Sequence, residues 1–158
     1  MKKVSLLLLA VSLATFSCKK KGCIDKEATN YNEKAKKDDG TCIFPSALME
    51  GTYNVTESCY GLGNDNYTIT IVATGNTTVR INSILGGTAS MIGSTTDGKS
   101  LKINAQSAIP DKSNYYWDMD NGATGFLDGN TLTLNYQMDD ILYGNNYGTV
   151  NCTATCNK

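Results

Sequence analysis

The six cysteines are the side chains of this 158-residue chain that most clearly predict a chemistry. A serine or cysteine nucleophile most often needs a histidine base, and the sequence contains no histidine. Zinc binding is also disfavoured, because no Cys-x-x-Cys pair occurs and three residues separate Cys152 from Cys156 in a strand-like segment. The cysteines therefore predict disulfide bonds in an oxidising compartment.

Carboxylates are the second set of side chains that could do chemistry. A pair of aspartates could hydrolyse a glycoside, but the candidates lie beside glycine and asparagine, which is typical of turns. We therefore predict no catalytic residue, no cofactor and no enzymatic activity. The aspartates concerned are Asp118, Asp120, Asp128, Asp139 and Asp140.

The chain begins with the features of an export signal. Lys2 and Lys3 precede an apolar run over residues 4–16. A membrane-spanning helix needs about 20 apolar residues, whereas a secretory signal needs about 7–15. The length of the run therefore favours export over a transmembrane helix.

The end of this segment, Ser17 followed by Cys18, resembles the signal of bacterial lipoproteins. The resemblance implies that residues 1–17 are a signal peptide and that Cys18 carries acyl chains such as palmitate. It also implies attachment to the cell envelope, with the outer membrane expected and the periplasmic or surface side left open. The alternatives are an ordinary signal peptide cleaved near Ala14 or an uncleaved anchor.

Cleavage before Cys18 would remove two lysines and leave 12 basic and 15 acidic residues, a formal net charge of −3. A weakly acidic chain without a basic stripe predicts no nucleic-acid partner. The three lysines at 19–21 follow the acylated position, so residues 18–22 are predicted to be a lipid anchor and tether that contacts the membrane.

A polar segment over residues 23–44 follows the tether and holds too few apolar residues to fold unaided. Cys23 and Cys42 bracket it, and we expect a disulfide between them that stiffens a stalk. The Asn-Tyr-Asn and Asp-Asp-Gly elements resemble a short cysteine-bracketed module of exported bacterial proteins. Calcium is the weaker alternative, since side-chain oxygens are present without the spacing of an EF-hand. These candidate ligands are Asp25, Asn30, Asn32, Asp38 and Asp39.

Residues 50–158 alternate between apolar and polar side chains with a period of two, which predicts half-buried strands. The clearest segments are 51–58, 66–74, 77–84, 100–106, 130–138 and 146–155, and glycine-rich turns separate them. We predict an all-β domain, an antiparallel meander that closes into a barrel or a sandwich. The only local helix candidate, residues 47–50, is short.

The domain begins Gly51-Thr52-Tyr53, continues with Leu-Lys-Ile-Asn-Ala-Gln at 101–106, and then has Gly-x-x-Gly-Phe at 122–126 and Leu-Thr-Leu-Asn-Tyr at 132–136. This order resembles lipocalin-like lipoprotein domains, although Gly51-Thr52-Tyr53 departs from the Gly-x-Trp of the lipocalin barrel. The resemblance implies a barrel that could hold a small apolar ligand. In an up-and-down barrel the first and last strands are neighbours, so we expect Cys59 to pair with Cys152. Cys156 is the rival partner, but it lies nearer the chain end.

Two functional hypotheses remain open at this point. The first is a lipid-anchored, non-catalytic β domain that binds a small apolar ligand or an envelope partner. The second is a structural or adhesive surface protein that contacts protein or glycan through exposed strands. Tyr115, Tyr116 and Trp117 form an aromatic group that belongs either to the core or to such a contact surface.

Overall fold

The computed structural model describes residues 19–110, 116–142 and 145–158, which form a closed antiparallel β-barrel preceded by a stapled segment. Ten strands, one α-helix and one 3-10 helix occur in these residues. They are α1 (Pro45–Met49), β1 (Gly51–Cys59), β2 (Gly63–Ala73), β3 (Thr78–Asn82), η1 (Ile84–Gly86), β4 (Ser90–Ser94), β5 (Ser100–Ile103), β6 (Gln106–Pro110), β7 (Tyr116–Met119), β8 (Ala123–Asp128), β9 (Thr131–Leu142) and β10 (Asn145–Asn157).

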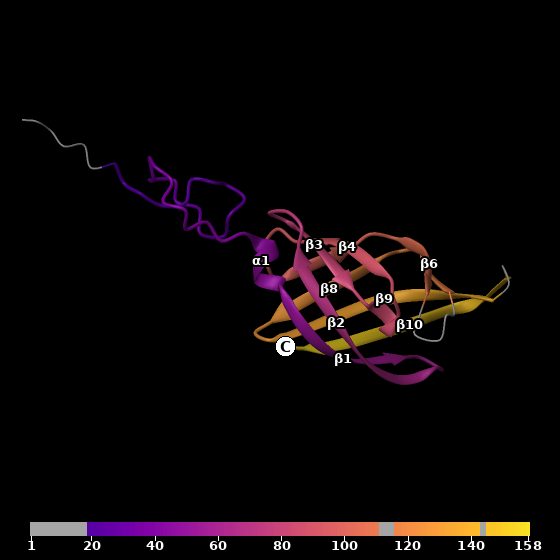
Figure 1. The fold of residues 1–158 in the computed structure, drawn as a ribbon. Helices are drawn as coiled ribbons and strands as arrows, with labels where there is room; N and C mark the ends of the chain where they lie inside the picture. The colour runs from indigo at the N-terminus through magenta and orange to yellow at the C-terminus, as the bar shows by residue number, and fades with distance from the viewer. Residues whose placement is uncertain (1–18, 111–115, 143–144) are drawn as a thin grey trace, which may run out of the picture.

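Eight strands close the barrel in the order β10-β1-β2-β3-β4-β5-β8-β9, and β9 pairs back with β10 (Figure 1). Every pair between these strands is antiparallel. The predicted all-β antiparallel barrel is therefore confirmed, and the sandwich alternative is not the one adopted.

One hairpin departs from a simple meander. The strands β6 and β7 pair with each other, and β7 then pairs with the part of β9 that extends past β8, through Trp117–Asp140 and Asp118–Asp139. The closed ring of eight strands leaves this hairpin out, because β5 pairs directly with β8. The length of β9 makes this possible, because its first half completes the barrel and its second half carries the hairpin.

Period-two alternation places the apolar side chains inside the barrel and the polar ones outside. Along β9, Leu132, Leu134, Tyr136 and Met138 are all at most 5% exposed, whereas Asn135 and Gln137 between them are exposed. Inward side chains of the other ring strands join the same core, among them Tyr53, Ile69, Ile81, Met91, Ile103 and Ala154. Gly125 also faces inward, where a Cβ would approach the Leu134 side chain to 2.6 Å, so a larger residue would make that leucine shift.

One end of the barrel is covered by α1. The buried Met49 side chain enters the core, and the Tyr53 hydroxyl donates a 2.7 Å hydrogen bond to the Met49 carbonyl. The last residue returns to the same end, where the Lys158 ammonium donates to the Leu48 carbonyl and lies 5.2 Å from the centre of the Tyr53 ring.

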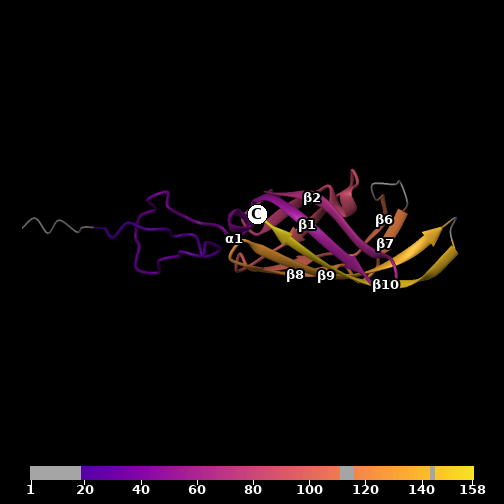
Figure 2. The same cartoon turned by 90° about the horizontal axis from the view of Figure 1, so that it is seen from below.

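The stapled segment, residues 19–44, projects from the α1 end of the barrel, as two perpendicular views show (Figures 1 and 2). It contacts the barrel at the turn between β2 and β3, where Asn76 donates a 2.8 Å hydrogen bond to the Glu27 carboxylate. Ser46, at the start of α1, donates to the carbonyl of Gly75 in the same turn. Few bonds therefore join the segment to the barrel.

None of the helices in residues 19–110, 116–142 and 145–158 combines the length and apolar character needed to cross a membrane.

Candidate functional site

The predicted acylation site, Cys18, lies outside the described residues, so lipidation there stays a prediction. The lysines that follow it are exposed at the beginning of the described chain. The side chains of Tyr115, Tyr116 and Trp117 also lie outside the described part of the structure. The choice between core and contact surface for that aromatic group therefore stays open.

In the stapled segment Cys23 is bonded to Cys42, with 4.8 Å between their Cα atoms. Asn30 adds a second connection across the loop, because its amide donates to the Thr41 carbonyl at 2.6 Å and accepts from the Ile43 amide at 2.8 Å. The disulfide and this asparagine together hold a loop that has only a few buried apolar residues.

The five candidate calcium ligands of this segment are used as local turn acceptors or, for Asn30, as the clamp just described. Asp25 accepts from the Glu27 amide, Asn32 from Lys34, Asp38 from Gly40 and Asp39 from Thr41. The hydrogen bonds from Thr41 are also the main reason that the pKa of Asp39 is lowered. Such side-chain to backbone bonds are what acidic and amide residues form in turns. The disulfide staple is present, and calcium binding by these five residues stays the alternative prediction.

The second disulfide joins Cys59 at the end of β1 to Cys152 in β10, two residues that face each other directly in the strand pairing. Cys156, the rival partner, is a free thiol with no exposed surface. Burial, reinforced by the Glu57 carboxylate, raises the pKa of this thiol to about 12. The thiol is therefore protonated and poorly nucleophilic at neutral pH.

A charged residue lies inside the barrel beside the disulfide. Glu57 faces inward from β1, is 5% exposed, and accepts a short hydrogen bond from the Tyr136 hydroxyl of β9. Burial is the main cause that raises the pKa of both Tyr136 and Tyr67 above the usual range, and the Glu57 carboxylate acts in the same direction. The bond from Tyr136 to Glu57 thus joins β9 and β1 inside the barrel, whereas the buried hydroxyl of Tyr67 in β2 makes no hydrogen bond within the described residues.

This cluster is not a metal site in the oxidised protein. One oxygen of Glu57 and the sulfurs of Cys59 and Cys152 lie within 4.8 Å of one another, which is the spacing of a ligand group. The two sulfurs are bonded to each other, however, and a metal binds the thiolate form of cysteine.

A groove of about 360 Å³ lies on the outer side of the barrel wall over β8, β9 and β10. We call it the amide groove, because amide and hydroxyl side chains point outward into it and none of its lining residues is charged. Its exposed polar side chains are Asn121, Thr124, Asn135, Gln137, Asn151 and Thr153.

Hydrogen bonds link these side chains across the strands. Asn121 donates to the Gln137 carbonyl oxygen at 3.2 Å, and Gln137 donates to that of Asn151 at 2.9 Å. Thr153 donates to Asn135 at 3.1 Å, one step further along the same strands. The cross-strand pairing of β9 with β10 places both pairs directly opposite each other, so the wall of the groove is ordered.

A tight turn forms the rim of the groove at Asn121 and Gly122. Gly122 has a φ of +68°, and a Cβ at this position would stand 2.1 Å from the Ile103 carbonyl oxygen. Only glycine fits there, and it fixes Asn121 next to the end of β8. No local sequence pattern reveals this groove, because its side chains come from separate segments whose register only the folded barrel defines.

No protein-family model matches this chain, and no curated protein matches it by sequence. Among solved structures, it is similar to a putative outer membrane protein from Bacteroides fragilis, with a TM-score of 0.47 and 17% identity over 74% of this chain and 54% of that one. The chain spans about half the length of that protein. A redesigned β-barrel is similar with a TM-score of 0.45 and 12% identity over 72% of this chain and 94% of the design. Neither likeness assigns a function.

Proposed function

We propose that this chain is a lipid-anchored protein of the bacterial cell envelope, held in the outer membrane by acyl chains on Cys18. Its barrel is a non-catalytic binding module, and the stapled segment is the short stalk that joins the module to the lipid. The basic start, the apolar run and the Ser17-Cys18 junction support the anchor. Acyl chains would tether such a protein without a membrane-spanning segment.

The observation that carries the binding role is the position of the amide groove. The inward positions of the described ring strands hold large apolar side chains, and nine of these are less than 2% exposed: Tyr53, Ile69, Ile71, Val79, Ile81, Met91, Ile103, Leu132 and Leu134. An eight-stranded barrel has an interior just wide enough for side chains to fill or for one small ligand. The groove, by contrast, opens to solvent. We therefore infer that the partner binds to the outer wall over β8, β9 and β10.

A small apolar ligand inside the barrel is the second candidate. Glu57, Tyr67 and Tyr136 favour it, because a few polar groups in an otherwise apolar interior could orient such a ligand. Native mass spectrometry of the protein purified without denaturation separates the two proposals. A bound molecule of constant mass that leaves only on unfolding would favour the interior and contradict the outer wall.

The anchor is tested by expressing the full precursor in a Gram-negative host with radiolabelled palmitate. We expect label in the protein and recovery in the detergent phase of a detergent partition. The Cys18→Ala variant should lose both. Unlabelled protein that stays in the aqueous phase would contradict the anchor.

The binding surface is tested in cells with a photo-crosslinking amino acid at position 137, in the amide groove. The matched control carries it at position 66 of β2, which is also an exposed amide position. We expect an adduct from position 137 alone. Equal adducts from both positions, or none from position 137, would refute the outer wall as the contact surface.

A further inference from the structure

We infer that the amide groove recognises a neutral polysaccharide, an inference that rests on the proposed binding role of the outer wall. Its first support is the kind of side chain that lines the groove. Asparagine, glutamine and threonine both donate and accept hydrogen bonds without carrying charge. A chain of sugar hydroxyls offers the same combination of donors and acceptors.

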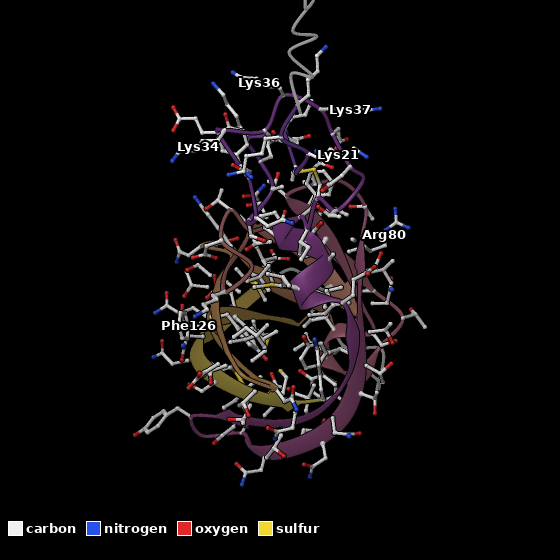
Figure 3. All side chains as sticks on the ribbon, turned by 90° about the vertical axis from the view of Figure 1, so that its left-hand side faces the viewer. Lys21, Lys34, Lys36, Lys37, Arg80 and Phe126 are labelled. Carbon is white, nitrogen blue, oxygen red and sulfur yellow. A yellow bond between two sulfur atoms is a disulfide. The ribbon has the colours of Figure 1, made fainter. Side chains whose placement is uncertain are left out.

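The absence of charge from the groove distinguishes a neutral ligand from a charged one. An anionic polymer would be expected to meet lysine or arginine, and a basic peptide would be expected to meet carboxylates. The charged residues at its edges are mostly acidic: Asp120 precedes Asn121 and Asp139 lies two residues beyond Gln137, while Lys102 pairs with Thr124. Arg80 lies on the other side of the barrel from Phe126, and four labelled lysines lie in the stalk (Figure 3). The carboxylates at these edges disfavour an anionic polymer, and the groove itself offers no charged partner to a basic one.

The uncharged surface also extends beyond the groove. Between Thr131 and Gln137 of β9 and between Asn151 and Asn157 of β10, every outward side chain is threonine, asparagine or glutamine, and the direct pairing of the two strands makes them one continuous polar face. A long polymer could thus follow the wall beyond the groove. This polar face comprises Thr131, Thr133, Asn135, Gln137, Asn151, Thr153, Thr155 and Asn157.

Two exposed aromatic residues flank the groove. Phe126 is 53% exposed, and it follows Thr124 by two residues on the same face of β8. Tyr60 is 88% exposed, and its backbone amide donates to the Asn151 carbonyl at 3.0 Å, so it adjoins the opposite side. Large exposed rings cost free energy in water, and a ring face can stack on the apolar face of a pyranose. Amides between two aromatic residues are thus suited to a sugar chain.

The geometry of the amides is set before a ligand arrives. The bonds from Asn121 to Gln137 and from Gln137 to Asn151 use one N–H group of each donating amide. A primary amide has a second N–H and a second lone pair, which suit hydroxyl groups of a ligand. Because neighbouring strands already order these side chains, less conformational entropy is lost on binding.

The experiment is affinity electrophoresis of the acylated full chain in detergent, through gels that contain one polysaccharide each. The neutral probes are amylopectin, a mixed-linkage β-glucan, a galactomannan and an arabinoxylan, and the anionic probes are polygalacturonate and heparin. We expect retardation by at least one neutral probe and by neither anionic one. Retardation by the anionic probes alone, or by no probe, would overturn the inference.

A matched pair of variants assigns any retardation to the groove. Asn135 and Asn66 each accept a hydrogen bond from a threonine across the strands, at 3.1 and 3.0 Å, but only Asn135 lines the groove. Asn135→Ala should weaken binding about tenfold, the effect of one well-placed hydrogen bond, and Asn66→Ala less than twofold. Phe126→Ala should weaken it by a similar factor through lost stacking. Equal effects of Asn135→Ala and Asn66→Ala would contradict the inference.

The outcome also separates this inference from the proposed function. A photo-crosslinked adduct at position 137 with no polysaccharide binding would leave the outer wall as the contact surface and refute the glycan. A failure of both would refute the proposed binding role of the outer wall. Thermal unfolding of each variant, followed by far-UV circular dichroism, shows that the compared proteins are folded.

Discussion

The disulfide between Cys59 and Cys152 should carry a large share of the barrel's stability, and Cys59→Ala/Cys152→Ala is the variant that tests this. The bond joins residues separated by 93 positions and ties the first barrel strand to the last. In the chain-entropy model, closing a loop of this size removes about 4.6 kcal/mol of unfolded-state entropy at 25 °C. A domain of this size is stable by about 5–15 kcal/mol, so the variant should lose a third or more of the total.

The Cys23–Cys42 bond gives the matched comparison. Its separation of 19 residues corresponds to about 3 kcal/mol in the same model, but the constraint lies within the stalk. The stalk contacts the barrel through few hydrogen bonds, such as that between Asn76 and Glu27. Cys23→Ala/Cys42→Ala should therefore leave the barrel's free energy of unfolding unchanged within about 0.5 kcal/mol.

Equilibrium unfolding in urea, followed by far-UV circular dichroism, measures the barrel in both variants. The expected result is a lower midpoint for Cys59→Ala/Cys152→Ala and an unchanged one for Cys23→Ala/Cys42→Ala. Limited trypsin digestion measures the stalk, because Lys34, Lys36 and Lys37 are exposed in its loop and should be cut faster without the staple. If both double variants changed the barrel midpoint equally, or neither did, this account of the two bonds would be refuted.

Three further predictions concern single side chains. Tyr136→Phe removes a hydrogen bond to the buried Glu57 carboxylate and should lower the free energy of unfolding by about 2 kcal/mol. Tyr53→Phe removes a hydrogen bond to a neutral carbonyl and should lower it by about 1 kcal/mol. Urea unfolding measures both variants. Asp97 accepts from the Lys99 and Ser100 amides, which lower its pKa to about 2, so its contribution is present above about pH 4 and is lost as the pH falls through 2. Asp97→Asn should cost about 1 kcal/mol at pH 7, allowing for solvent screening of this exposed group, and nothing below pH 2; a difference that persists at pH 1.5 would contradict the assignment. The Cys156 thiol should react with iodoacetamide at pH 8 only as fast as the barrel opens, so rapid labelling in native buffer would disprove its burial.

Most of the barrel could be predicted from the sequence, because apolar and polar side chains alternate along its long strands over enough residues to identify each strand. The segment 130–138 put Leu132, Leu134, Tyr136 and Met138 on one face, and these side chains are buried in the structure. The segments 66–74 and 100–106 behave in the same way. Burial on one face fixes the register of each such strand, so the pattern and the fold agree.

The strands that the pattern missed are short or interrupted by glycine. In β4, Ser90–Ser94, only Met91 marks the inward face strongly, because the next inward residue is Gly93. In β8 the inward position between Ala123 and Leu127 is Gly125. Glycine has no side chain to contribute to alternation, and at both positions a leucine side chain fills the space that a Cβ would enter. The insertion of the β6–β7 hairpin between β5 and β8 is invisible to any local pattern, since it depends on the length of β9.

The burial of Glu57 shows a different limit of prediction from the sequence. The strand 51–58 alternates so that Glu57 shares a face with Tyr53 and Val55, and this face is buried in the structure. The signal was therefore present, but a glutamate near a strand end is usually exposed. What overrides that expectation is the Tyr136 hydroxyl, which lies 79 residues away in the sequence and on a strand that reaches Glu57 only across β10.

The geometry of the barrel bears on how the proposed anchor and the amide groove could work together. The chain enters the barrel at the α1 end, and Lys158 returns to that end by its bond to Leu48. Asn151 precedes Lys158 by seven residues along β10, which corresponds to about 23 Å at the rise of a strand. A lipid on Cys18 would hold the α1 end nearest the membrane, with the stapled segment between them, and would thus keep the groove more than a barrel's half-length from the lipid headgroups. A polymer approaching from the aqueous side could reach the amides of the wall without displacing the anchor. A shortened stalk should therefore weaken binding of a long polysaccharide on whole cells while leaving binding by detergent-solubilised protein unchanged, and equal losses in both assays would argue against a spacing role.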